Sequence, residues 1–199
     1  MHYSNKELID LGLKKIGKNC KISNKIFIYS NNIEIGDNVR IDDLVTLKGK
    51  IVLKDNVHLA KGCTLSGGNK GIFLDDFATI SNFVQFFTIS DDYVSPNIPT
   101  GTLNKIAIEK FSKIYNKSIY IGKNVLIGSM SVILPGAIVG DYSSIGALSV
   151  IYKKIEKGSY YSNHNKIVNK KRDIVLMKAK MIKIKKYLKS IYLQKKINN

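Results

Sequence analysis

Aliphatic residues recur every six positions over most of this chain. The clearest run places one at each of Ile121, Ile127, Ile133, Val139, Ile145 and Ile151. Four places after the first five of these stand Val125, Ser131, Ala137, Ser143 and Ser149, and the aliphatic phase is seen earlier at Ile16, Ile22, Ile35, Ile41, Leu47, Leu53, Leu59, Leu65, Leu74, Ile80 and Phe86. A period of six is not that of an amphipathic helix, whose apolar positions lie three or four residues apart.

Each six-residue unit predicts a short strand followed by a tight turn. Glycine follows the aliphatic position at Gly122, Gly128, Gly140 and Gly146, and a flat antiparallel sheet would not need glycine at a fixed phase. Three such strands can make one triangular coil, and stacked coils about 4.8 Å apart bury a continuous aliphatic column. The pattern therefore predicts an all-β fold, a parallel β-helix of hexapeptide repeats.

The stretch from 121 to 151, IGKNVLIGSMSVILPGAIVGDYSSIGALSVI, resembles the hexapeptide-repeat acyltransferases, which include sugar O-acetyltransferases. Counting the weaker N-terminal coils, the resemblance extends over residues 14–172. It implies a left-handed coil, although parallel crossovers are normally right-handed. It also implies a homotrimer whose acetyl-CoA grooves lie between subunits.

Interruptions of the repeat divide the chain into three parts. Ser4 and Glu7 form a capping box, which predicts a short helix that closes the lower end of the column. Long loops inside a compact domain are usually functional, and one interrupts the later coils. The expected parts are a capping helix over 1–13, a β-helix domain over 14–160 with a protruding loop at 91–118, and a basic tail with an amphipathic C-terminal helix over 161–199.

The protruding loop implies the acceptor site. In the family that the chain resembles, this loop carries or borders the acceptor and often supplies a histidine as general base, but residues 91–118 contain no histidine. Asp91 and Asp92 are the nearest substitutes, because a partly desolvated carboxylate beside a like charge can have its pKa raised toward neutrality. The alternative for two adjacent acids is a solvated turn or a helix cap. Ser90 and Tyr93 flank them as candidate acceptor-binding residues.

His58 is the third candidate base. It closes the hexad that begins at Leu53, so counting three strands to a coil places it at a different corner from the loop at Asp91. Within one subunit it should not reach the loop, but a trimer could bring two corners together. The alternative is an ordinary surface or interface histidine.

The resemblance also implies an acyl-donor site. After the last hexads the family continues with a Gly-Asn-Pro-Ala-Lys-like element, and the corresponding residues here run from Ser162 to Lys166. By that resemblance Lys166 and Arg172 contact the phosphates of acetyl-CoA, and backbone near Ser129 and Ala147 borders its pantetheine arm. The alternative for the two basic residues is a solvated strand end. No activated serine or cysteine is evident, so direct attack on the thioester is expected.

Beyond Asp173 the six-residue period gives way to helical spacing. Apolar residues three and four apart form a stripe at Ile174, Met177, Met181, Ile184, Leu188 and Ile191. Lysines occupy the remaining faces, so this helix is expected either to pack on its own trimer or to lie on an anionic membrane surface. Of the formal net charge of +17, +13 falls within residues 153–199.

Composition narrows the remaining possibilities. No apolar run approaches the roughly 18 residues of a membrane span, which predicts a cytoplasmic protein. Cys20 and Cys63 fall at core positions about two coils apart, so reduced thiols are expected. No set of residues has zinc-like spacing, and the basic tail contains no recognised nucleic-acid motif, so neither a metal nor a nucleic-acid partner is expected.

These observations favour an acetyl-CoA-dependent acetyltransferase acting on a sugar hydroxyl of a bacterial surface polysaccharide or its precursor. The first alternative is an N-acetyltransferase of a nucleotide-linked amino sugar. The missing loop histidine favours it, because an amine needs less help from a base than a hydroxyl does. A second alternative, from another class, is a trimeric scaffold without catalysis.

Overall fold

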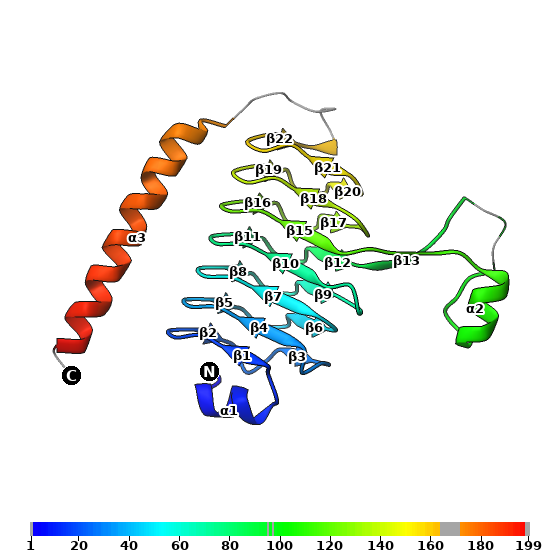
Figure 1. Ribbon diagram of the computed structural model, residues 1–199, viewed down its shortest axis with the longest axis horizontal. Helices are drawn as coiled ribbons and strands as arrows, with labels where there is room; N and C mark the ends of the chain where they lie inside the picture. The colour runs from blue at the N-terminus through cyan, green and yellow to red at the C-terminus, as the bar shows by residue number, and fades with distance from the viewer. Residues whose placement is uncertain (1, 95, 97, 164–171, 198–199) are drawn as a thin grey trace.

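The chain coils into a three-sided prism with one helix beside it and one loop projecting from it (Figure 1). This computed structural model describes residues 2–94, 96, 98–163 and 172–197. All strand pairs within the prism are parallel, and each strand away from the two ends pairs with the strands one coil below and one coil above it. The predicted parallel β-helix is therefore confirmed.

Each side of the prism is one parallel sheet. The first face contains β1 (Lys15–Ile16), β4 (Ile33–Ile35), β7 (Ile51–Leu53), β10 (Ile72–Leu74), β15 (Ile119–Ile121), β18 (Ile138–Val139) and β21 (Lys154–Ile155). The second contains β2 (Lys21–Ile22), β5 (Arg40–Ile41), β8 (His58–Leu59), β11 (Thr79–Ile80), β16 (Leu126–Ile127), β19 (Ser144–Ile145) and β22 (Tyr160–Tyr161). The third contains β3 (Phe27–Ile28), β6 (Thr46–Lys48), β9 (Thr64–Ser66), β12 (Gln85–Phe87), β17 (Val132–Ile133) and β20 (Val150–Ile151).

The interior of the prism is the aliphatic column that the hexads predict. Residues such as Ile80, Phe86 and Ile127 are completely buried. The small polar residues of the repeat are buried too, and their hydroxyls serve the turns: Ser131 Oγ donates to the carbonyl oxygen of Gly128 at 2.8 Å, and Ser149 Oγ to that of Gly146 at 2.7 Å. Serine is thus tolerated in the core because each hydroxyl has a partner.

The turns bring successive coils into close contact. A β-carbon added to Gly128 would lie 2.4 Å from the backbone nitrogen of Ala147 in the coil above. No real side chain fits at that distance, which is why glycine follows the aliphatic position of the repeat. Cys20 and Cys63 lie in turns of the prism and form no disulfide.

The N-terminal helix α1 (Asn5–Asp10) closes the lower end of the prism. Its capping box is complete, because Glu7 N–H donates to Ser4 Oγ at 3.3 Å and Ser4 N–H donates to Glu7 Oε2 at 2.7 Å. Leu8 is 1% exposed and joins the bottom of the aliphatic column. The predicted cap and its capping box are both present.

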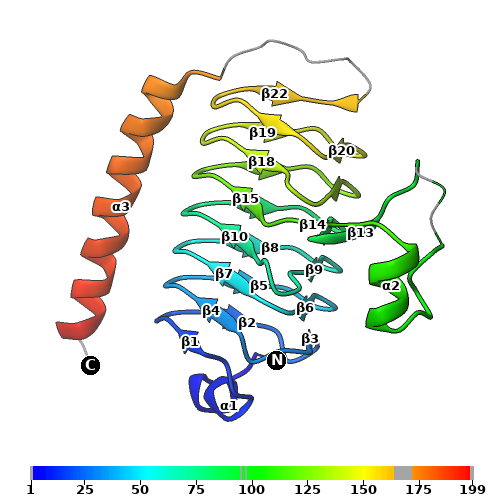
Figure 2. The same ribbon diagram turned by 45° about the vertical axis from the view of Figure 1, so that its right-hand side comes forward.

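The C-terminal helix α3 (Ile174–Ile197) runs back down beside the corner where the first and second faces meet (Figures 1 and 2). Asp173 Oδ1 accepts a hydrogen bond from Leu176 N–H at 2.9 Å and so caps its first turn. Midway along it, Lys185 Nζ lies 2.8 Å from Asp76 Oδ2, and Met181 is 9% exposed. Among the helices that the structure describes, none is long and apolar enough to cross a membrane.

Candidate functional site

The protruding loop leaves the prism after β12 and returns before β15, as a short antiparallel ribbon of β13 (Ile89–Asp91) and β14 (Ile114–Asn116). Helix α2 (Lys105–Phe111), which the sequence did not predict, lies at its far end, away from the prism (Figure 2). No residue of α2 is buried. The loop presents apolar side chains to solvent, among them Tyr93 (86% exposed), Val94, Ile106 and Phe111.

Asp91 stands at the base of the loop, the last residue of β13. Thr100 donates twice to its carboxylate, from the hydroxyl to Oδ1 at 2.5 Å and from the backbone N–H to Oδ2 at 3.1 Å. These hydrogen bonds lower the pKa of the Asp91 carboxyl from its usual value. The expectation of a pKa raised by a neighbouring like charge is therefore wrong for Asp91, which is ionised at neutral pH.

Asp92 has a different environment from its neighbour. Its side chain is 3% exposed and pairs with Lys113, whose Nζ lies 3.1 Å from Asp92 Oδ2. Val94 N–H donates to its Oδ1 at 3.0 Å. The ion pair raises the pKa of the Lys113 ammonium. Asp92 thus ties the outgoing strand of the loop to the returning one, while Asp91 is half-buried.

The two candidate acceptor-binding residues flank this pair of carboxylates. Ser90 pairs with Tyr115 across the ribbon, and its Oγ donates to the backbone carbonyl of Asp91 at 3.1 Å. Tyr93 lies at the surface of the loop. Asp91, Asp92, Ser90 and Tyr93 therefore share one short segment at the root of the loop.

His58 lies on the second face, whereas the loop leaves the third, so the structure confirms that the two belong to different sides of the prism. His58 Nε2 is 2.9 Å from Asp42 Oδ2, and Arg40 Nε is 2.7 Å from Asp42 Oδ1. Burial opposes ionisation of Asp42, but the hydrogen bonds from His58 and Arg40 outweigh it and lower the pKa of this carboxyl. The imidazole is held by a carboxylate, beside the corner between the second and third faces.

That corner, called here the second corner, carries a ladder of exposed apolar residues. Leu44, Phe83, Met130 and Leu148 occupy equivalent turn positions with φ between 58° and 62°, and they are 44–58% exposed. A side chain other than glycine or asparagine in this left-handed conformation costs roughly 1–2 kcal/mol. At the corner between the first and second faces, the first corner, asparagine takes the same position at Asn19, Asn38, Asn56 and Asn124. Phe77 and Tyr142 take it in two other coils, but neither of these side chains is exposed.

The ladder is a feature that the sequence reasoning missed. The sequence did contain a signal for it, because apolar residues recur in the turn position that asparagine holds in four coils of the first corner. Ser129 and Ala147, expected to border the pantetheine arm, lie in this same corner, Ser129 half-buried and Ala147 exposed. Ser129 accepts the N–H of Leu148 at 2.9 Å through its carbonyl.

The two basic residues expected at the CoA phosphates stand apart from that corner. Lys166 lies outside the described residues. Arg172 lies at the first corner, where its Nη1 donates to the carbonyl oxygens of Tyr142 at 3.1 Å and Ser143 at 3.0 Å. Burial lowers the pKa of its guanidinium. Within one chain, therefore, Arg172 and the Ser129–Ala147 backbone belong to different corners.

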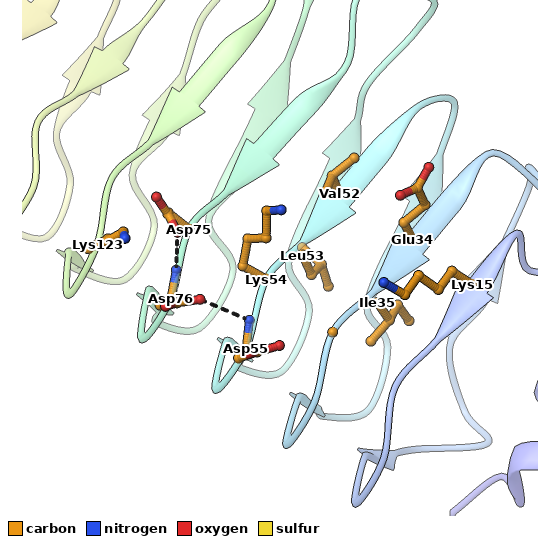
Figure 3. A pocket seen from close by; sticks show the side chains of 11 residues that line it. Lys15, Glu34, Ile35, Val52, Leu53, Lys54, Asp55, Asp75, Asp76 and Lys123 are labelled. Atoms are coloured by element: carbon orange, nitrogen blue, oxygen red, sulfur yellow. Dashed lines mark hydrogen bonds between the residues drawn. The ribbon is translucent and has the colours of Figure 1, made fainter. Parts of the chain in front are cut away.

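A depression of about 380 Å³ on the first face is lined by Lys15, Glu34, Lys54, Asp55, Asp76 and Lys123 among others (Figure 3). Its carboxylates serve the turns: Asp76 Oδ1 accepts the N–H of Asp55 at 3.3 Å, and Asp75 Oδ1 accepts the N–H of Asp76 at 2.8 Å. This depression therefore belongs to the scaffold. Over the described ranges, no three His, Cys, Asp or Glu side chains are grouped to hold a metal ion.

Comparison with known proteins gives the same fold and points to one kind of chemistry. The family "Bacterial transferase hexapeptide (six repeats)" matches residues 118–153. A dTDP-4-amino-4,6-dideoxy-D-glucose acyltransferase of Escherichia coli is 36% identical over 154 residues, 75% of this chain and 78% of that protein. Galactoside O-acetyltransferase of Escherichia coli K12 is 40% identical over 88 residues, 37% of this chain and 43% of its own.

Solved structures of AntD resemble the chain almost throughout. AntD, an N-acyltransferase of Bacillus cereus in complex with dTDP and 3-hydroxybutyryl-CoA, matches 96% of this chain and 98% of its own with a TM-score of 0.85 at 29% identity. A match over 96% of the chain takes in most of the protruding loop as well as the prism. The similarity therefore covers the elements that carry the candidate residues.

Proposed function

Since this chain belongs to the hexapeptide-repeat acyltransferases, we propose that it transfers an acyl group from acyl-CoA to the amino group of a nucleotide-linked deoxysugar. The observation that carries the choice of acceptor is the extent of similarity. The amino-sugar acyltransferase and AntD match most of the chain, whereas the galactoside enzyme matches 37% of it. Acetyl-CoA is the simplest donor of this class, and the bound 3-hydroxybutyryl-CoA of AntD makes longer acyl groups worth testing.

The loop chemistry supports an amine acceptor. The segment contains carboxylates and no imidazole, and Thr100 keeps the Asp91 carboxyl ionised. An amino sugar reaches the enzyme as an ammonium ion and has to lose one proton before it can attack, which a carboxylate can assist. Deprotonating a sugar hydroxyl is much harder and favours a base with a pKa near neutrality.

In the proposed reaction, Asp91 accepts a proton from the ammonium group and the free amine attacks the thioester carbonyl carbon. The C–S bond then breaks, the amide forms, and the CoA sulfur leaves as a thiolate that takes up a proton. Asp92 is a positioning residue in this scheme, because the ion pair of its buried carboxylate with the exposed Lys113 sets the geometry of the loop root. Ser90 and Tyr93 border the acceptor.

We infer that the working unit is a homotrimer. The ladder of the second corner and the protruding loop are both exposed apolar surfaces of a single chain. In a symmetric oligomer the same pair of surfaces can meet at every interface. If the loop of one subunit covers the second corner of the next, Asp91 and the His58–Asp42 pair come to one site from different chains. His58 then becomes an alternative base or a residue that orients the acceptor.

The acyl-donor site is also shared between two subunits in this proposal. Backbone near Ser129 and Ala147 borders the pantetheine arm in this proposal, and Lys166 and Arg172 hold the phosphates. Because Arg172 stands at the first corner and Ser129 at the second, one CoA molecule can meet both only where two subunits contribute. Acyl-CoA and nucleotide sugars are cytoplasmic substrates, so the proposed place of work is the cytoplasm, with α3 available for contact with the membrane.

The test is transfer to a matched pair of acceptors. The purified protein is incubated with acetyl-CoA or 3-hydroxybutyryl-CoA and either a dTDP-linked 4-amino-4,6-dideoxyhexose or the same nucleotide sugar carrying a 4-hydroxyl. Release of free thiol and the product mass are followed. The amino acceptor should react at least about a hundredfold faster, because the base available suits an amine. Preferential acylation of the hydroxyl compound supports the O-acetyltransferase alternative instead, and failure to bind any acyl-CoA supports the scaffold.

A further inference from the structure

One side of the helix α3 packs against the prism, and the opposite side points away from it. Met181 is 9% exposed and Lys185 pairs with Asp76, so this side is held against the first corner. Val175 and Ile182 are 81% and 58% exposed. Arg172 Nη1, bonded to two turn carbonyls, fixes the chain just before the helix begins. The helix is therefore anchored along one side with the opposite side free in the single chain.

The free side, called here the outer face, is defined by Val175, Ala179, Ile182 and Lys186. These positions are spaced by four, three and four residues, so they form one stripe along an α-helix with 3.6 residues per turn. All four are exposed. By the same geometry, Lys178 and Lys189 flank the stripe on one side and Lys183 on the other.

The positive charge of α3 restricts the kind of surface that the outer face can bind. The helix carries eight lysines and no acidic residue. A second copy of the same face would bring like charges together, which opposes self-association. A surface that is both anionic and able to admit apolar side chains fits, and a bilayer containing acidic lipids offers phosphates at the depth of the lysine heads and acyl chains just below.

We propose that the outer face of α3 docks the protein on a membrane surface rich in anionic lipids. The helix lies flat on the bilayer, Val175 and Ile182 enter the boundary between headgroups and acyl chains, and the flanking lysines extend to lipid phosphates while their stems stay on apolar surface. Helix α3 does not span the bilayer. Docking does not depend on the acyl-transfer reaction, because the outer face contains none of the proposed site residues.

Vesicle sedimentation with the full-length protein tests this proposal. Vesicles of phosphatidylcholine alone should leave the protein in solution, and vesicles that also contain phosphatidylglycerol should sediment it, less so as salt is added. Lys183→Gln/Lys186→Gln should weaken binding by about thirtyfold, taking about 1 kcal/mol, or about fivefold, from each lysine near the surface. Lys21→Gln/Lys48→Gln on the prism removes the same charge from exposed strand positions and should leave binding nearly unchanged.

The apolar contribution has its own matched pair. Ile182→Ser should weaken vesicle binding, whereas Ile9→Ser on α1, at a side chain of similar exposure, should not (58% and 60%). Equal losses from both lysine pairs, or equal binding to uncharged vesicles, would overturn the proposal. So would an Ile182→Ser variant that changes molar mass in light scattering and leaves vesicle binding intact, since the face would then join copies of the chain. Acyl transfer in solution, measured on each variant, separates loss of docking from loss of function.

Discussion

Replacing two rungs of the second-corner ladder by asparagine should separate the subunits and leave each one folded. Met130 and Leu148 are 58% and 56% exposed in the single chain, so a partner subunit could cover rather more than half of each side chain. Full burial of such a side chain is worth about 1.5–3 kcal/mol, and the exposed part therefore about 1–1.5 kcal/mol. The double variant Met130→Asn/Leu148→Asn should then lose about 2–3 kcal/mol of association free energy per subunit.

In a trimer the loss of association free energy adds up over the three subunits. Within each chain, by contrast, the two substitutions do not destabilise the fold. Three subunits together lose about 6–9 kcal/mol, which lowers the trimer association constant by roughly 10⁴ to 10⁶. Both residues have positive φ, 58° in each case, and asparagine tolerates that conformation better. The isolated subunit should consequently unfold at the same temperature as before or slightly higher.

Light scattering over a dilution series measures the first effect, and thermal unfolding of the dilute protein measures the second. Val175→Asn/Ile182→Asn on α3 is the matched control, because it also removes two exposed aliphatic side chains, at a place away from the second corner. If the ladder variant dissociates no more readily than this control, the second corner is not the interface. A wild-type protein that is monomeric and active would refute the shared site altogether.

Three further outcomes follow from the site and the coil. Mixed trimers made from equal amounts of Asp91→Asn and His58→Asn subunits should recover about a quarter of wild-type turnover if each site takes the two residues from different subunits; no recovery would place both in one chain. Thr100→Val removes a donor to Asp91, so the pKa of that carboxyl should rise and the acid limb of the pH–rate profile should move to higher pH. Any loss of folding stability should be seen near neutral pH and disappear below about pH 4, where the carboxyl is protonated in the unfolded chain. If the acid limb does not move, it reports the titration of another group. Gly128→Ala should lower unfolding stability in denaturant titration by about 1–3 kcal/mol or more, since the new β-carbon would lie 2.4 Å from Ala147 N, and an unchanged midpoint would show that the coils can separate there.

The prism could be predicted because its information is local and repeated. One hexad specifies a buried aliphatic residue, a small residue and a turn, and the same pattern recurs from Ile16 to Ile151. The capping box at Ser4 and Glu7 is equally local, with its two partners three residues apart. Short-range patterns of this kind survive without knowledge of the rest of the chain.

For the site, the sequence could predict only the segment of the chain in which it lies. Asp91 receives its hydrogen bonds from Thr100 and Asp92 its ion pair from Lys113, nine and 21 residues further along an irregular segment. No sequence period connects such residues. The sequence therefore predicted which segment contains the site, but not the hydrogen-bond and ion-pair partners of each carboxylate. The raised pKa expected for Asp91 failed for this reason, because Thr100 donates two hydrogen bonds to its carboxylate.

The lower end of the prism also bears on how these molecules behave at high concentration. The strands β1, β2 and β3 form the lowest coil of the prism. The exposed edge of a parallel stack of strands is a template on which another stack can grow. In this chain residues ahead of the prism occupy that edge: Tyr3 N–H donates to the carbonyl of Ile22 at 2.9 Å, His2 bridges Ser23 in the antiparallel sense, and Leu8 plugs the column. An antiparallel partner interrupts the parallel register, so residues 2–10 should block stacking of a second prism on this end, and their removal should favour end-to-end polymerisation of otherwise intact prisms.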